Sequence, residues 1–122
     1  MEGIKNDQGK APLSWIPLTA LEQEAQAFAF GAKKYDRHNF KNGMAWSRLL
    51  DAALRHINQF ADGQDVDIES GLSHLAHSRA CLSMLMYLVD KNKGTDDRYK
   101  EPDPEPTTEE ILDQCPSKKM SW

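Results

Sequence analysis

The chain has 122 residues, a formal net charge of −4 and a mean hydropathy of −0.69, the size of one small domain with room for a tail. Its longest apolar run, Leu82–Val89, is far shorter than the roughly 20 residues of a membrane-spanning helix, and no leader-like segment opens the chain. The two cysteines have neither a metal-type nor a disulfide-type spacing, so we expect a protein of a reducing cytosol without membrane attachment.

The negative charge is not spread evenly along the chain. Residues 1–94 contain eleven acidic and eleven basic residues, whereas residues 95–122 contain eight acidic and four basic ones. The second segment also contains alternating prolines in Glu101–Pro106, which oppose helix and sheet formation. We therefore predict a neutral folded domain over residues 1–94 and an acidic, mostly disordered tail over residues 95–122, with one short helix at Thr108–Gln114.

Hydrophobic periodicity predicts three main helices in the folded domain. Thr19–Glu22 has the form of a capping box, and the apolar spacing after it predicts a helix of about four turns that ends near Tyr35. A loop then leads into a second helix at about Trp46–Asp62. A third helix, from about residues 67–70 to Asn92, is apolar almost all round in its second half.

This pattern is typical of the all-α class, as a small bundle of three main helices. No strand-like alternation, internal repeat or glycine-rich phosphate loop interrupts it. Three helices of this length provide a thin hydrophobic core for a single subunit. We therefore expect a homo-oligomer in which a partner subunit completes the bundle.

Hydrogen-bond donors are concentrated at the end of the first predicted helix. Lys33, Lys34 and Tyr35 are followed closely by Arg37 and His38, a set that suits phosphate oxygens. Cations in the last turn of a helix also complement the helix dipole without binding any ligand. The spacing leaves both interpretations open.

Carboxylates are concentrated just before the third predicted helix. Asp65, Asp67 and Glu69 alternate along the chain and offer oxygen ligands for a hard cation such as Mg²⁺. Acidic residues at a helix N-terminus are also favoured for purely structural reasons. On the first helix, Glu24 flanks the apolar stripe and is placed to reach a cation in the interior.

Two histidines on the third helix predict a polar group inside the bundle. His74 and His77 are three residues apart and leave the same face of the helix, with Glu69 close by in sequence. Arg55 and His56 on the second helix can meet them from across the bundle. A zinc site needs a third ligand at a firm spacing, and the sequence identifies none. Histidines of this kind are also found as ordinary core residues.

The loop between the first two helices contains groups that suit a nucleobase. Asn39 offers an amide for edge hydrogen bonds, while Phe40 and Trp46 offer rings for stacking. Aromatic residues in such loops also close the end of a helical bundle, so a structural role stays open.

Seven segments, taken together and in order, resemble the N-terminal-type domain of bacteriophage dATP/dGTP diphosphohydrolases. The similarity covers roughly residues 4–92. The segments are Lys10–Leu13, Phe30–Tyr35, Asn39–Phe40, Trp46–Leu49, Arg55–His56, Gly63–Gly71 and His74–His77. Position 40 is Phe where we would expect Trp, and position 64 is Gln where we would expect an acidic residue.

The resemblance implies a phage enzyme of the host bacterial cytoplasm that depends on Mg²⁺, with Mn²⁺ as a substitute. Its substrates would be dGTP or dATP, cut to the monophosphate and pyrophosphate, and no nucleic acid polymer is expected as a partner. The implied phosphate-binding residues are Lys33, Lys34 and Arg55, and the base-binding residues are Asn39 and Trp46. The implied metal-binding residues are Asp67 and Glu69, with Glu24, and the catalytic residues are Glu69, His56, His74 and His77.

Two other functions stay open beside this one. The wider group of all-α nucleotide pyrophosphohydrolases has an E-x-x-E helix and a later E-x-x-D helix, whereas the only E-x-x-D pattern here is Glu110–Asp113 in the tail. That difference is compatible with a non-catalytic oligomer that binds and sequesters a nucleotide, such as a signalling nucleotide of host defence. It is also compatible with a structural helical module whose histidines are core residues.

Overall fold

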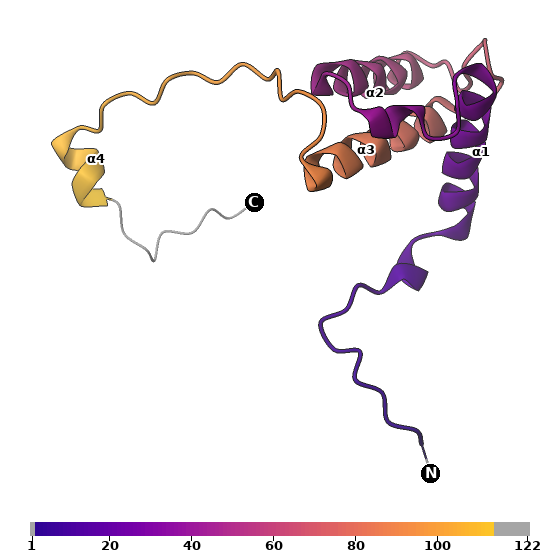
Figure 1. Ribbon diagram of the computed structural model, residues 1–122, viewed down its shortest axis with the longest axis horizontal. Helices are drawn as coiled ribbons and strands as arrows, with labels where there is room; N and C mark the ends of the chain where they lie inside the picture. The colour runs from indigo at the N-terminus through magenta and orange to yellow at the C-terminus, as the bar shows by residue number, and fades with distance from the viewer. Residues whose placement is uncertain (1, 114–122) are drawn as a thin grey trace.

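A computed structural model describes residues 2–113, and every regular element in this part of the chain is a helix (Figure 1). In order they are the 3₁₀ helix η1 (Leu13–Trp15), α1 (Leu18–Lys34), the 3₁₀ helix η2 (Asn39–Asn42), α2 (Trp46–Ala61), α3 (His74–Lys91) and α4 (Thr108–Asp113). The predicted all-α class is confirmed. Within residues 2–113, none of these helices has the length and apolar character needed to span a bilayer.

The first main helix starts without a side-chain cap. α1 begins at Leu18 directly after Pro17, whose carbonyl accepts hydrogen bonds from the backbone N–H groups of Ala20 (3.1 Å) and Leu21 (3.3 Å). The predicted capping box at Thr19–Glu22 is therefore wrong. Thr19 lies inside the first turn, and its hydroxyl accepts a hydrogen bond from the Gln23 side chain at 3.2 Å.

The core is small and rich in alanine. α2 and α3 lie side by side, and α1 packs against α3 (Figure 1). The buried apolar residues are Ala27, Leu49, Ala53, Ala76, Ala80 and Leu88. Small side chains let the helices approach closely, and the hydroxyl of buried Ser78 donates to the Ala53 carbonyl at 2.9 Å across the α2–α3 contact. Leu88 is fully buried, and Leu49 is the other leucine among these residues.

A loop, rather than the start of a helix, precedes α3. The third helix begins at His74, so the predicted start at residues 67–70 is wrong. Gly71 has φ +72°, a left-handed conformation that interrupts a helix, and Ser73 caps α3 by accepting a hydrogen bond from the Leu75 N–H at 3.1 Å. The backbone N–H of Asp67 donates to the Leu72 carbonyl at 2.8 Å and closes the loop on itself.

The segment after α3 returns to the N-terminal end of α2. The Trp46 N–H donates to the Thr95 carbonyl at 2.9 Å, and the Asp97 carboxylate accepts hydrogen bonds from the backbone and hydroxyl of Ser47. Gly94 (φ +74°) permits this return, because an added Cβ would lie 2.2 Å from the Met44 carbonyl oxygen.

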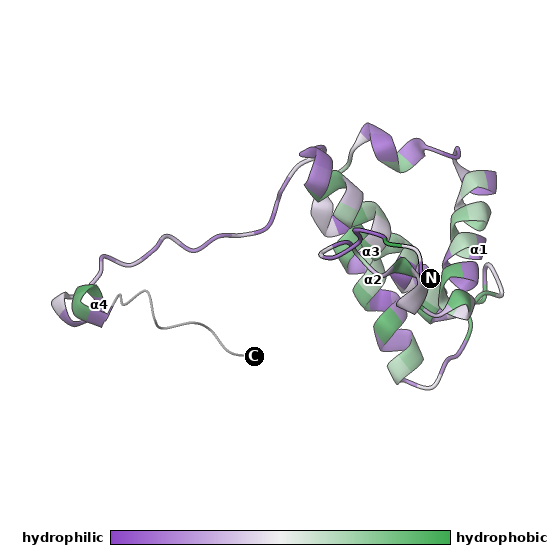
Figure 2. Ribbon diagram, turned by 90° about the horizontal axis from the view of Figure 1, so that it is seen from below, coloured by the Kyte–Doolittle hydropathy of each residue, from purple (hydrophilic) through white to green (hydrophobic). Residues whose placement is uncertain are grey.

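Beyond this contact the chain is extended and hydrophilic up to α4 (Figure 2). α4 covers Thr108–Asp113 of the short helix expected at Thr108–Gln114, and its side chains are exposed. Residues 114–122, where the tail prediction continues, lie outside the described residues.

Candidate functional site

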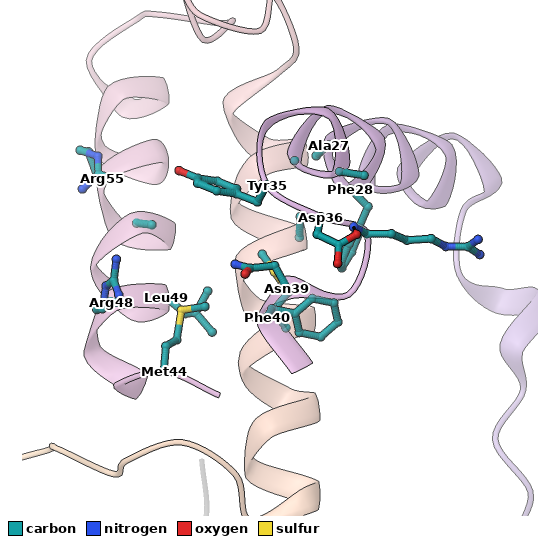
Figure 3. A pocket seen from close by; sticks show the side chains of 16 residues that line it. Ala27, Phe28, Tyr35, Asp36, Asn39, Phe40, Met44, Arg48, Leu49 and Arg55 are labelled. Atoms are coloured by element: carbon teal, nitrogen blue, oxygen red, sulfur yellow. Dashed lines mark hydrogen bonds between the residues drawn. The ribbon is translucent and has the colours of Figure 1, made fainter. Parts of the chain in front are cut away.

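A cleft of about 400 Å³ opens between α1, η2 and the α2–α3 pair. Tyr35 and Asn39 project into it from the segment after α1, facing α2 (Figure 3). Phe28 and Phe40 form an aromatic wall, with ring centroids 5.9 Å apart. This combination of apolar walls and a few polar groups, at this size, is that of a small-ligand site.

Cationic side chains line the α2 side of the cleft. Arg48 and Arg55 both line it together with Ala52, because residues three, four and seven apart lie on the same face of a helix. Arg37 contributes a third guanidinium from the loop. Arg55 was among the predicted phosphate-binding residues, whereas Arg48 was missed, although its i, i+7 spacing from Arg55 was a usable signal.

A second group of polar side chains lies one helical turn beyond the cleft. His56 directly follows Arg55 on α2, and His77 lies three residues before Ala80, which lines the cleft on α3. The imidazole of His56 stacks on that of His77, with centroids 4.8 Å apart and planes 16° apart. The structure thus brings the predicted histidines together beside the cleft.

Hydrogen bonds join the histidines to the loop before α3. His74 Nδ1 lies 2.8 Å from His56 Nδ1, and His74 Nε2 lies 2.8 Å from Gln64 Oε1. His77 Nε2 lies 2.6 Å from the Ser70 hydroxyl oxygen. Gln64 and Ser70 were not among the predicted site residues; the Asp67-x-x-Ser70 spacing, typical of a side-chain-bonded turn, was the available signal for Ser70.

The surroundings of His56, His77 and Asp67 shift the pKa values of these three groups downward. Burial lowers the pKa of His56, assisted by the neighbouring His77 and His74. Burial also lowers the pKa of His77, against the opposing effect of Asp67. Partial burial of Asp67 acts to raise its pKa, but hydrogen bonds from Ser70 outweigh this effect and the net shift is downward. Neutral imidazoles beside an ionised carboxylate are therefore favoured at neutral pH.

An ion pair joins a predicted phosphate-binding residue, Lys34, to a predicted metal-binding residue, Glu69. Lys34 Nζ lies 2.8 Å from Glu69 Oε1, which connects the end of α1 to the loop before α3. The hydrogen bond and charge of Glu69 raise the pKa of Lys34. Both side chains are exposed, so they remain accessible to a ligand.

Three predicted site residues make other contacts or stay apart. Glu24 forms an ion pair with Arg79 (3.2 Å) and accepts a hydrogen bond from the Ser83 hydroxyl (2.9 Å), both on α3. Trp46 donates its indole N–H to the Lys93 carbonyl at 2.8 Å and joins the chain return instead of the cleft wall. Lys33 is exposed at the end of α1.

Comparison with known proteins points to one family. A family model described as "dATP/dGTP diphosphohydrolase, N-terminal" matches residues 1–98. A protein of Salmonella phage PMBT28 named dATP/dGTP diphosphohydrolase is 43% identical over 98 residues, which are 80% of this chain and 33% of that protein. The chain thus spans about a third of the length of the curated relative that it matches. No solved structure gives a significant match.

Proposed function

Because the chain belongs to the family of N-terminal domains of dATP/dGTP diphosphohydrolases, we propose that it hydrolyses dATP or dGTP to the monophosphate and pyrophosphate in the cytoplasm of an infected bacterium. The observation that carries this proposal is the position of the arginine-lined cleft one helical turn from the histidine–carboxylate group. A nucleotide whose base occupies the cleft would extend its triphosphate toward this group.

In this arrangement the cleft takes the nucleoside. The aromatic wall of Phe28 and Phe40 supplies an apolar surface for the purine, and the Asn39 amide supplies donors and an acceptor for its edge. Arg55 lies at the boundary between cleft and histidines, where its planar guanidinium can hold phosphate oxygens by paired hydrogen bonds. Lys34 approaches the same region from α1.

The reaction requires a water molecule to attack a phosphorus atom while the bond to the leaving pyrophosphate breaks. His77 is the candidate base for the water's proton, because its side chain is 13% exposed whereas His74 is fully buried. Arginine and lysine side chains stabilise the negative charge that develops on the phosphate oxygens. His74, with both ring nitrogens hydrogen-bonded, acts by holding His56 and the loop in position.

Mg²⁺, or Mn²⁺ in its place, belongs to the proposal as the partner of the nucleotide's phosphates, where it supplies neutralising charge. The expected resident set of Glu24, Asp67 and Glu69 does not converge in the part of the chain that the structure describes, because Glu24 is paired with Arg79 and Ser83. Asp67 and Glu69 remain on the loop beside the histidines, and Glu69, the more exposed of the two, is the carboxylate that would contact a nucleotide-bound cation.

The test is product analysis after incubation of the full chain with dATP and dGTP, with Mg²⁺ or Mn²⁺. We expect deoxynucleoside monophosphate and pyrophosphate in equal amounts, and loss of both products in Glu69→Gln. Glu109→Gln, which makes the same change on the exposed α4, is the control and should retain turnover. Absence of turnover with every common nucleotide, or recovery of bound nucleotide intact from the denatured protein, would contradict the proposal.

A further inference from the structure

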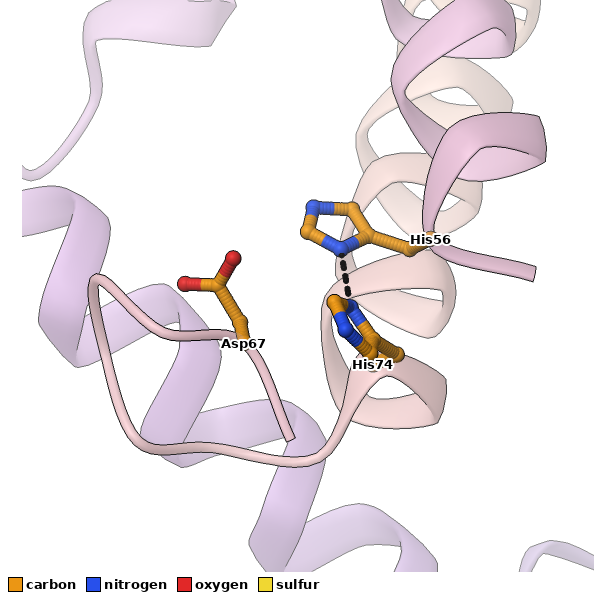
Figure 4. Close-up of side chains that lie close together, drawn as sticks. All are labelled: His56, Asp67 and His74. Carbon is orange, nitrogen blue, oxygen red and sulfur yellow. Dashed lines mark hydrogen bonds between the residues drawn. The ribbon is translucent and has the colours of Figure 1, made fainter. Parts of the chain in front are cut away.

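Two imidazoles and one carboxylate converge where α2, the loop before α3 and the start of α3 meet. His56, Asp67 and His74 each offer one ligand atom, and the three atoms lie within 4.8 Å of one another. The two rings come from different helices, and Asp67 lies opposite them on the loop (Figure 4). Asp67 supplies the third ligand that the sequence spacing did not identify.

The proton positions in this group follow from its hydrogen bonds. His74 is 0% exposed, so its ring nitrogens exchange no hydrogen bonds with bulk water. Its Nε2 lies 2.8 Å from the side-chain carbonyl oxygen of Gln64, which can only accept, so Nε2 carries the proton in the neutral tautomer. Its Nδ1 consequently carries a lone pair, directed at His56 Nδ1 2.8 Å away.

The two Nδ1 atoms already lie at a separation that suits two ligands of one metal ion. Metal–nitrogen bonds of about 2.0–2.1 Å place two imidazole ligands of one ion roughly 3 Å apart, close to the separation already present. We propose that His56, His74 and Asp67 bind one divalent transition-metal ion. On binding, the proton of the neutral His56 ring moves from Nδ1 to Nε2 by exchange with solvent, and both Nδ1 lone pairs then coordinate the ion.

The neighbours of the three ligands hold them in a binding orientation. Gln64 accepts the Nε2 proton of His74, which fixes the ring and leaves Nδ1 free to coordinate. The Ser70 backbone N–H donates to Asp67 Oδ2 at 2.9 Å and orients the carboxylate. His77 stacks flat on His56 and restricts rotation of its ring. Such outer partners are a usual component of built metal sites.

The ligand set selects the class of ion. Two imidazole nitrogens and one carboxylate oxygen suit Zn²⁺, Co²⁺, Mn²⁺ or Ni²⁺, whereas Mg²⁺ prefers oxygen ligands and retains its waters. The site is thus distinct from the Mg²⁺ proposed to accompany the nucleotide. Metal binding at the His56, His74 and Asp67 site needs no nucleotide. A failure of nucleotide hydrolysis and a failure of metal binding would therefore be separate results.

The experiment titrates the chelator-treated full chain with Co²⁺ and follows visible absorption, with calorimetric titration of Zn²⁺ and Mg²⁺ in parallel. We expect one Co²⁺ per chain, little net release of protons, and much weaker binding of Mg²⁺. His56→Gln and Asp67→Asn should each weaken Co²⁺ binding by at least about tenfold. His38→Gln, an identical change at an exposed histidine outside the group, should leave it unchanged.

Circular dichroism reports whether each variant folds. If a variant does not fold, NMR of the wild-type chain still tests the proposal. In NMR spectra of the wild-type chain, Zn²⁺ should shift the Nδ1 resonances of His56 and His74 and leave those of His38 in place. The proposal is overturned if the wild-type chain does not bind Co²⁺ in a one-to-one ratio, if folded variants retain full affinity, or if Zn²⁺ shifts neither ring.

Discussion

Lys34 Nζ lies 2.8 Å from Glu69 Oε1, so the last turn of α1 is tied to the loop that carries Asp67. Their side chains are 45% and 60% exposed, and ion pairs at such exposure contribute little to folding stability because water screens them. In the proposed function, by contrast, Lys34 faces the phosphates and Glu69 faces the cation that accompanies them. We therefore expect Lys34→Met to lower turnover of dATP and dGTP while changing the melting temperature little.

A matched change elsewhere separates this effect from a general loss of charge. Lys91→Met alters an exposed lysine at the end of α3, whose nearest carboxylate, that of Asp90, is 3.8 Å away. Turnover should persist in this variant, as measured by pyrophosphate release. Equal turnover in Lys34→Met and the wild-type chain would remove Lys34 from the proposed site.

Nucleotide affinity should depend on the polar side chains of the cleft. Arg55→Gln removes a guanidinium and Asn39→Ala removes an amide, and the loss of one good hydrogen bond to a bound ligand weakens affinity by about tenfold. We expect each change to raise KM or Kd by about that factor, measured by initial rates and by calorimetry. Arg98→Gln, outside the cleft and paired with Asp96, should leave affinity unchanged.

Folding stability should fall as the solution becomes acidic. The pKa values of His56 and His77 are lowered by burial, so between the unfolded value of about 6.5 and the lower folded values the unfolded chain binds more protons. The contribution of these two histidines to folding stability is therefore fully present above a pH of about 6.5, and it decreases as the pH falls toward their folded pKa values. Thermal melting of the metal-free chain from about pH 8 to about pH 5 measures this slope.

Substitution of a contributing histidine tests the origin of that slope. His77→Gln should flatten the dependence of melting temperature on pH in this range, because one proton-linked group is lost. His38→Gln, at an exposed position, should preserve the wild-type slope. An unchanged slope in His77→Gln would assign the acid sensitivity to other groups.

Stability should also respond to truncation of a fully buried leucine on α3. Leu88 is 0% exposed, and Leu88→Ala is expected to lower the free energy of unfolding by about 2–5 kcal/mol. Leu112→Ala, the same change on α4 at a side chain that is 79% exposed, should have a much smaller effect. Denaturation by urea measures both. Similar losses for the two variants would contradict the described packing of α3.

An apolar face of the α2–α3 pair suggests self-association. Leu54 and Ile57 on α2, and Leu82 and Met86 on α3, remain 40–71% exposed, and on α3 they lie on a different side from the alanines that contact α1. Their spacing of three and four residues is that of helices packed in bundles. We expect a second copy of the chain to cover this face, so that Leu82→Glu yields a monomer by light scattering.

The control for this prediction uses an exposed apolar residue far from the face. Ile111→Glu on α4 introduces the same charge at a side chain that is 56% exposed and should preserve the oligomer. A wild-type chain that is already monomeric at high concentration would contradict the prediction.

Local spacing was sufficient to predict the helices and several members of the site. The second helix was expected at Trp46–Asp62 and is found at Trp46–Ala61, because apolar residues three and four apart place a continuous stripe on one face. The same spacing correctly placed His74 and His77 on the third helix. These properties depend on neighbours within one or two turns, which the sequence displays directly.

The assembly of the site depended on contacts between distant residues. Asp67 approaches His56 and His74 because Gly71 turns the chain and the Asp67 N–H bonds to the Leu72 carbonyl, a loop that the helix pattern had concealed. Glu24 is held by Arg79 and Ser83, and Trp46 by Lys93, although their residue types also suited a metal and a base. Periodicity tells which face a side chain leaves, but its partner there is decided by how the loops and helices pack.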